Sequence, residues 1–105
     1  MIIGIGNDII DIKRIEKTIN KYGKKFINRC FTQVEIKRSE KRLNKINSYA
    51  KRYAAKEACA KALGTGLSHG IFWKDIIIEN DTYGKPYIKL YRKARQRLEQ
   101  LYSKS

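Results

Sequence analysis

Three side chains of this sequence could together bind a phosphate group and a metal ion. Asp8 follows a short apolar stretch, and Glu57 and Lys61 lie four residues apart, which is one turn on the same side of a helix. Mg²⁺ often takes only one or two carboxylates from a protein and fills its other positions with water and substrate phosphate. A lysine beside such an ion would help to neutralise a pyrophosphate during phosphoryl transfer. The pattern indicates phosphate chemistry if the fold brings Asp8 and Glu57 together.

The same residues also have a purely structural interpretation. Asp8 could form a turn at the end of a strand, and Glu57 and Lys61 could form an exposed ion pair of the kind that is common on helices. His69 is the only histidine, and we interpret it as a surface residue because no cysteine or carboxylate cluster accompanies it. Residue type and spacing alone leave both interpretations open.

Composition restricts the class of protein and its partners. The chain has 105 residues, which predicts a single domain over residues 1–105, and 42% of them are hydrophobic, too many for a disordered tail. Its net charge of +14 implies an anionic partner. We expect no membrane segment and no signal peptide, and we interpret Cys30 and Cys59 as reduced, buried thiols of a cytoplasmic protein.

The stretch Arg52–Gly66 predicts the long helix around which the chain is organised. Alanine and leucine favour a helix, and Gly64 and Gly66 are suited to end it because glycine tolerates the left-handed backbone of a C-cap. Five alanines keep the helix thin enough for other backbone to approach closely. Two stripes recur at helical spacing and could face a core: Ala54, Ala58, Ala62 and Ala55, Cys59, Leu63.

The segment before this helix predicts a strand followed by basic helices. We expect a buried strand over Met1–Ile10 and then a helix capped by Asp11, with an apolar stripe at Ile12, Ile15 and Ile19. Many charge runs are only solvated faces, but this helix carries almost one sign of charge, which favours docking on an acidic surface. Its basic residues are Lys13, Arg14, Lys17, Lys21, Lys24 and Lys25.

A capping box, Thr32 with Glu35, predicts the start of another helix after a helical hairpin closed by Phe26, Ile27 and Phe31. This helix would carry Lys37, Arg38, Lys41 and Arg42. The polar stretch Asn44–Ser48 predicts a loop, and Ser48 is suited to cap the central helix.

The segment after the central helix predicts a loop over Leu67–Gly70 and then a β-hairpin. Its strands would span Asp75–Glu79 and Tyr87–Tyr91, joined by a turn. Arg92–Tyr102 predicts a basic helix whose inward residues are Ala94, Leu98 and Leu101.

Five groups of residues, taken in order, resemble a known family. They are Ile3–Ile10 with Lys13–Ile15, Phe31-Thr32 with Glu35, Arg52–Ala58 with Lys61–Gly66, Asp75-Ile76, and Gly84–Pro86. The chain is similar in these positions, from about Ile2 to Leu90, to the bacterial holo-[acyl-carrier-protein] synthases, which are small 4′-phosphopantetheinyl transferases. Several ordered motifs are far more specific than any one of them alone.

The resemblance implies an α+β fold in which a small antiparallel sheet packs against the long central helix. It also implies transfer of the phosphopantetheine arm of coenzyme A to a serine of apo acyl carrier protein in fatty acid biosynthesis. By this resemblance Asp8 and Glu57 match the Mg²⁺ ligands, and Lys61 matches the lysine that contacts phosphate. These three residues are the expected catalytic set.

Further residues match the family's binding sites. The coenzyme pocket is expected to use Lys41, Arg42, Arg52, Lys61, Gly64 and Pro86. Arg14, with Lys13, is expected to contact the acidic recognition helix of the carrier protein. The resemblance also implies a homotrimer with sites between subunits, and a protein that binds neither nucleic acid nor membrane.

The sequence departs from the family at its C-terminal end, and two alternative functions stay open. Family members usually continue into two more strands, so we expect a C-terminally short domain with reduced activity. A chain that keeps the family's interactions without its catalysis is one alternative. The other is a small basic nucleic-acid-binding protein, for which the charge and the seven tyrosines argue.

Overall fold

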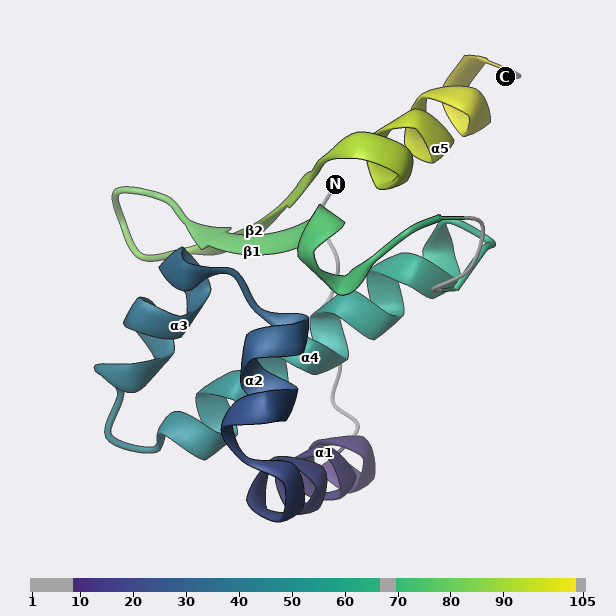
Figure 1. Ribbon diagram of the computed structural model, residues 1–105. Coiled ribbons are helices and arrows are strands. Elements are labelled where there is room, and N and C mark those ends of the chain that lie inside the picture. Colours follow the sequence, from purple (N-terminus) through teal and green to yellow (C-terminus); the bar gives the residue numbers. More distant parts are fainter. Residues whose placement is uncertain (1–8, 67–69, 104–105) are drawn as a thin grey trace.

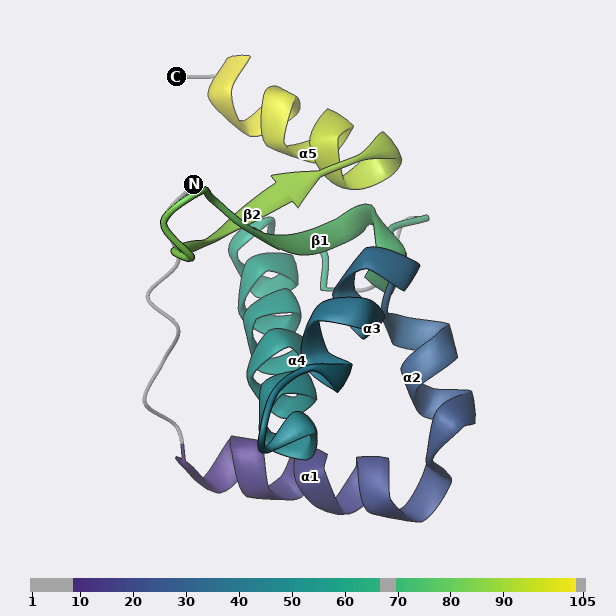
Figure 2. The same ribbon diagram turned by 90° about the vertical axis from the view of Figure 1, so that its left-hand side faces the viewer.

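The computed structural model describes residues 9–66 and 70–103 and shows helices and a two-stranded sheet that packs on one side of the longest helix (Figure 1). In chain order the elements are α1 (Ile9–Tyr22), α2 (Lys24–Cys30), α3 (Gln33–Glu40), α4 (Lys45–Ala62), the 3₁₀ turn η1 (Trp73–Asp75), β1 (Ile76–Asn80), β2 (Pro86–Leu90) and α5 (Arg92–Ser103). The longest helix, α4, runs between α1 at one side and the β-hairpin at the other (Figure 2). The expected α+β fold, with a small antiparallel sheet against a long central helix, is confirmed.

The N-terminal boundary of α1 differs from the prediction. The helix begins at Ile9, so Asp11 lies in its first turn and is not its N-cap. Ile9 and Ile10 therefore do not belong to a strand, because a short apolar run fits a helix as well as a strand. Residues 1–8, which include the remainder of the expected strand and Asp8, lie outside the described residues, as do Leu67–His69.

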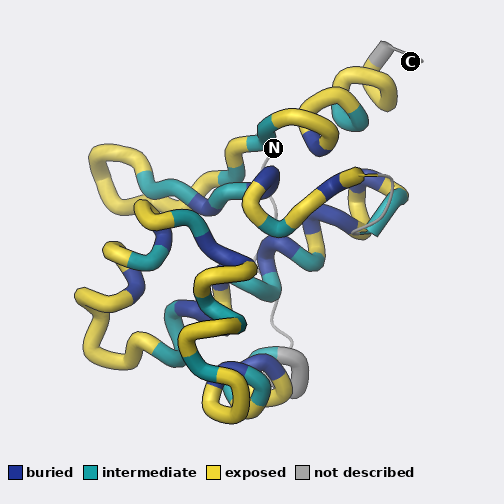
Figure 3. Tube along the Cα trace, viewed as in Figure 1, coloured by how far each residue is buried: buried dark blue, intermediate teal, exposed yellow. Residues whose placement is uncertain are grey.

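The start of α3 follows the predicted capping box. Glu35 N donates to Thr32 Oγ1 over 3.4 Å, and Thr32 N donates back to Glu35 Oε1 over 3.0 Å. The helix ends at Glu40, earlier than predicted. Lys41 and Arg42 therefore lie in the connection to α4, which is exposed (Figure 3).

The start of α4 also lies earlier than predicted. Asn44 is the N-cap, since its Oδ1 accepts a hydrogen bond of 3.0 Å from Asn47 N, and asparagine caps a helix as well as serine does. The expected loop Asn44–Ser48 is thus mostly the first turn of α4. Ser48 instead forms a hydrogen bond of 3.0 Å with Ser39 on α3.

The end of α4 agrees with the glycine signal. The helix ends at Ala62, Gly64 takes a φ of +78°, and Gly66 N donates to Ala60 O over 3.1 Å. A side chain at Gly64 would be strained in this left-handed conformation, so glycine is the residue suited to the position.

Two hydrophobic clusters hold the elements on α4. The cluster toward α1 and α2 contains Ile15, Ile19, Cys30, Phe31, Tyr49 and Ala50, and the cluster toward the hairpin and α5 contains Cys59, Ala60, Leu63, Ile71, Ile76 and Ala94. Of the two predicted stripes on α4, the one with Ala55, Cys59 and Leu63 is buried. In the other stripe Ala58 and Ala62 are exposed, so the prediction that it faces a core is wrong for this chain taken singly.

The hairpin and α5 follow the predicted order. β1 and β2 pair antiparallel with Ile78 opposite Ile88, and Ile78 is buried. α5 follows β2 directly and projects away from the other helices (Figure 1). Ala94 is buried as predicted, whereas Leu101 is 39% exposed, so its predicted inward position is wrong. This end of α5 lies beyond the elements that could cover it.

A buried ion pair joins the helices to the hairpin. Lys56 Nζ lies 2.8 Å from Glu35 Oε1, and both side chains are fully buried. The ammonium group also donates to Cys30 O over 2.9 Å and to Trp73 O over 3.1 Å. Glu35 Oε2 accepts from Ile78 N over 3.0 Å. Two side chains thus connect α2, α3, α4, η1 and β1.

We expect Lys56→Met to lower the free energy of unfolding by about 3–5 kcal/mol, because it leaves the Glu35 carboxylate buried without its counter-charge. A urea titration followed by circular dichroism measures the change. Replacing both residues, as in Glu35→Leu with Lys56→Met, should not restore stability, since four backbone groups also lose their partners. Arg95→Ala, which removes an exposed pair with Glu99, is the control and should leave the midpoint unchanged. A Lys56→Met protein as stable as the control would contradict this interpretation.

The two buried thiols give a pH prediction. Burial raises the pKa of Cys30 and of Cys59 from 9.0 to about 11. A pKa that is higher in the folded state contributes stability that is complete below pH 9 and is lost as the pH rises toward 11. We therefore expect the free energy of unfolding to fall less steeply between these pH values in Cys30→Ala with Cys59→Ala than in the parent chain. Urea titrations at several pH values between 9 and 11 measure this fall, and the same fall in both proteins would contradict the prediction.

Candidate active site

Glu57 lies where α4 meets α1, and its ion partner comes from α1. Arg14 Nη2 donates to Glu57 Oε1 over 3.2 Å, with the two side chains 55% and 29% exposed. The ion pair that spacing allows between Glu57 and Lys61 is therefore replaced by one that crosses between helices. A carboxylate that is 29% exposed and already attracts a cation remains accessible to a ligand.

Three aromatic side chains, Phe26, Tyr53 and Trp73, pack in a row at this part of α4. The rings of Phe26 and Tyr53 are 5.1 Å apart at their centres, and those of Tyr53 and Trp73 are 4.4 Å apart. Tyr53 precedes Glu57 by one helical turn. Burial, and then the charge of Glu57, raise the pKa of Tyr53 to about 12.

Lys61 and Gly64 lie at the C-terminal end of α4. Lys61 is exposed on the last turn. Arg97 of α5 donates from Nε to Leu63 O over 2.9 Å, which places a second cation at the helix end, where the helix dipole is negative. A Cβ on Gly64 would lie 3.4 Å from Arg97 Nη2. The sequence pattern did not single out Arg97, because only the packing of α5 brings it here.

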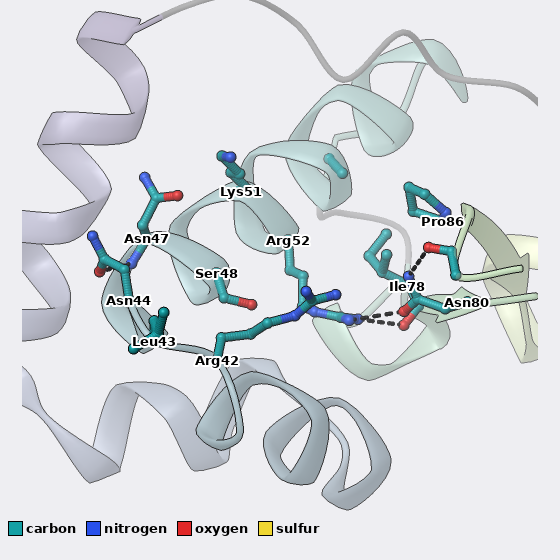
Figure 4. A pocket seen from close by; sticks show the side chains of 12 residues that line it. Arg42, Leu43, Asn44, Asn47, Ser48, Lys51, Arg52, Ile78, Asn80 and Pro86 are labelled. Carbon is teal, nitrogen blue, oxygen red and sulfur yellow. Dashed lines mark hydrogen bonds between the residues drawn. The ribbon is translucent and has the colours of Figure 1, made fainter.

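An open cleft of about 500 Å³ lies between α4, the α3–α4 connection and the hairpin (Figure 4). Three residues predicted for the coenzyme pocket line it: Arg42, Arg52 and Pro86. The other lining residues are Leu43, Asn44, Asn47, Ser48, Lys51, Ala55, Ile78, Asn80 and Gly84. Lys41 is a neighbour of Arg42 in the chain but does not line the cleft. With three cations and no carboxylate among its lining residues, the cleft suits an anion.

Arg52 forms the inner wall of this cleft and is only 7% exposed. Its guanidinium donates to Ile78 O over 2.7 Å and to Asn80 Oδ1 over 3.0 Å (Figure 4). Burial lowers the pKa of Arg52, while the charge of Glu35 opposes that change. Arg52 therefore fixes the hairpin on α4 in addition to bringing charge to the cleft.

The predicted residues occupy different sides of α4. At about 100° per residue, Glu57 lies roughly half a turn around the helix from the cleft residues Arg52 and Ala55. The exposed stripe with Ala58 and Ala62 lies between them and passes beside Lys61. The cleft, Lys61 and Glu57 could thus contact one extended ligand along this open face, although they do not share one pocket. Asp8 lies outside the described residues, and Lys13 is exposed on α1.

In the part of the chain that the structure describes, none of the helices is long and apolar enough to cross a membrane. The His, Cys, Asp and Glu residues of this part form no group of three or more that could hold a metal ion.

The signature helix, the cationic cleft and the hairpin fit one class of protein. The sequence model of the 4′-phosphopantetheinyl transferase superfamily matches residues 4–105, and the chain belongs to this superfamily. The match continues past Leu90, where the motif resemblance ended, through α5. The family predicted from the motifs is therefore confirmed.

Individual relatives agree with this membership. The chain is 56% identical over 101 residues to the holo-[acyl-carrier-protein] synthase of Rhizobium meliloti (strain 1021), which covers 96% of this chain and 73% of that protein. The crystal structure of the Neisseria meningitidis synthase matches with a TM-score of 0.72 at 34% identity, over 89% of this chain and 74% of that one. The Helicobacter pylori synthase, solved in complex with coenzyme A, matches with a TM-score of 0.67 at 28% identity, over 85% and 75%.

Proposed function

We propose that this chain transfers the 4′-phosphopantetheine arm of coenzyme A to a serine of apo acyl carrier protein, as a step of fatty acid biosynthesis. The serine oxygen bonds to the β-phosphorus of the coenzyme, and the bond from that phosphorus to the bridging oxygen breaks. Adenosine 3′,5′-bisphosphate leaves with the bridging oxygen, and the serine proton is released. The observation that carries this proposal is the 56% identity, over 96% of the chain, to a holo-[acyl-carrier-protein] synthase.

The nucleotide end of coenzyme A fits the cationic cleft. A volume of about 500 Å³ is within the usual range for small-molecule sites, and Arg42, Lys51 and Arg52 provide the charge that a phosphorylated ribose needs. Pro86 forms part of the wall, and Lys41 would add charge from the rim. From the cleft the exposed face of α4 leads to Lys61, which we assign to the pyrophosphate, with Gly64 keeping the backbone close to it.

We propose Mg²⁺ as the metal, held by Glu57 and Asp8. The fit rests on Glu57, whose carboxylate is 29% exposed and already attracts a cation. Two carboxylates are enough when water and substrate phosphate complete the coordination of Mg²⁺. When bound, the ion would neutralise charge on the pyrophosphate. Glu57 would then be shared between that ion and Arg14, so the Arg14 contact has to loosen on metal binding.

The carrier protein would dock on the basic face of α1. Lys13, Arg14, Lys17 and Lys21 are all exposed on this helix, while Ile15 and Ile19 are buried. Because Arg14 also touches Glu57, a carrier protein bound here would present its serine near the proposed metal site. Such charged contacts mainly steer association and are screened by salt.

We further propose a homotrimer in the cytoplasm. The exposed Ala58 and Ala62 leave a smooth helix face on which a second copy could close the open side of the coenzyme site. Cys30 and Cys59 are free and buried, in keeping with a reducing compartment. Light scattering of the purified protein tests the oligomeric state.

The nucleic-acid alternative gains little support. The exposed tyrosines of the described chain lie on different elements: Tyr22 on α1, Tyr83 in the hairpin turn, Tyr87 on β2 and Tyr102 on α5. Base stacking along a strand would need aromatic residues in one basic groove. The named activity of the relatives also favours the transferase.

The decisive experiment is mass spectrometry of apo acyl carrier protein after incubation with coenzyme A, Mg²⁺ and this chain. A mass increase equal to one phosphopantetheine group supports the proposal. Coenzyme binding without this increase would instead support a family member that has lost catalysis, and salt-dependent binding of RNA without need for Mg²⁺ would support the nucleic-acid alternative.

We expect Glu57→Gln to lower turnover at least about a hundred-fold while the unfolding midpoint stays near that of the parent, because the amide keeps the shape and loses the charge. Turnover by mass spectrometry and Mg²⁺ binding by calorimetry test this. Glu99→Gln, an exposed change on α5, is the matched control and should leave both values unchanged. Parent-like turnover of Glu57→Gln at saturating Mg²⁺ would reduce Glu57 to a surface ion-pair partner.

For the docking face, Lys17→Glu is a cleaner test than Arg14→Glu, because Arg14 also pairs with Glu57. We expect Lys17→Glu to raise the KM for carrier protein about three- to ten-fold at low salt, with the KM for coenzyme A unchanged. The effect should shrink as salt rises. Arg95→Glu makes the same charge reversal on α5 and should have less effect. Equal losses for both substrates at every salt concentration would argue against docking on α1.

A further inference from the structure

Asn80 connects three parts of the cleft wall. It is the last residue of β1 and is half-buried. Its Oδ1 accepts a hydrogen bond of 3.0 Å from Arg52 Nη2 on α4, and its Nδ2 donates to Gly84 O over 2.9 Å (Figure 4). One amide side chain therefore uses its acceptor toward the helix and its donor toward the hairpin turn.

The turn beyond Asn80 is well formed but exposed. Asp81 Oδ1 accepts from Tyr83 N and Lys85 N over 2.9 Å each, and Asp81 N donates to Lys85 O over 2.9 Å. Gly84 takes a φ of +84°, which favours glycine at this place. These bonds fix the shape of the turn itself. The bond from Asn80 fixes where the turn lies relative to α4.

We propose that Asn80 is a positioning residue for the nucleotide end of the substrate. Through Arg52 and Gly84 it sets the distance between α4 and the wall formed by Gly84 and Pro86 before the ligand arrives. Cleft width and the orientation of the Arg52 guanidinium are then fixed together. This inference rests on the proposed function, because it takes the cleft to be the nucleotide site.

The chemistry of the amide makes the proposal specific. An aspartate at position 80 would still accept from Arg52, but it could not donate to Gly84 O and would face that carbonyl with a second acceptor. Asn80→Asp should thus keep the hydrogen bond that holds β1 on α4 and lose the hydrogen bond that positions the turn. A hydrogen bond of this kind changes an equilibrium by a factor of about three to ten, so the expected loss of nucleotide affinity has that size. The carboxylate of Asn80→Asp would also repel the phosphates, so the uncharged Asn80→Ala separates the lost hydrogen bond from the added charge.

The test is calorimetric titration of the full chain with adenosine 3′,5′-bisphosphate, and separately with apo acyl carrier protein. Asn80→Asp and Asn80→Ala should each weaken nucleotide binding about three- to ten-fold and leave carrier-protein binding unchanged. Tyr87→Phe is the matched control, because it removes a 3.0 Å hydrogen bond to Glu79 from the same hairpin without touching the cleft. It should bind nucleotide like the parent chain.

Each other outcome has a distinct meaning. Parent-like nucleotide binding by Asn80→Asp would overturn the positioning role while the nucleotide site stands. Equal losses for nucleotide and carrier protein would also overturn it, since they would mark a general structural role. No nucleotide binding by the parent chain would overturn the assignment of the cleft, and this inference with it.

Discussion

The buried pair of Glu35 and Lys56 is the interaction on which the arrangement of the other elements depends. An ammonium group has three N–H donors, and here they meet a carboxylate on α3, a carbonyl at the end of α2 and a carbonyl in η1. Burial lowers the pKa of Lys56, and the Glu35 carboxylate opposes this by favouring the charged form. Removing two charges from water is costly, so we infer that the pair contributes specificity, because the arrangement seen here supplies a partner for each donor of the ammonium group.

This constraint explains why similar residues on α4 have different roles. Lys56 is fully buried and has a structural role. Arg52 is nearly buried, fixes the hairpin on α4 and lines the cleft, whereas Lys61 is exposed. Their order around the helix decides the difference, since each residue turns by about 100° from the one before it. Once Lys56 is held inside, Glu57 has to lie toward α1 and the Ala58–Ala62 face toward solvent. The position of the site thus follows from the core.

Local signals explain which features were predictable from the sequence. The capping box at Thr32, the glycines after α4 and the hairpin depend on residues a few positions apart, and all of them hold. The start of α4 was misplaced because both Asn44 and Ser48 could serve as its cap, and the start of α1 because a short apolar run fits a helix as well as a strand. Contacts between distant residues were not predictable: Arg14 pairs with Glu57 across 43 positions and Arg52 with Asn80 across 28. The candidate residues of the site were predicted through the family motifs, but their grouping depends on packing.

The Arg14–Glu57 contact shows how docking and chemistry can share a boundary in so small a domain. α1 packs on α4 through buried isoleucines, and this packing brings the basic face of α1 beside the carboxylate proposed to hold the metal. In a chain of net charge +14, a cationic side chain could occupy that carboxylate permanently. The Arg14 side chain is 55% exposed, and an ion pair exposed in this way is weak, so the arginine can turn toward an acidic partner. Under the proposed function, the surface that attracts the carrier protein therefore also holds the metal ligand until the substrates arrive.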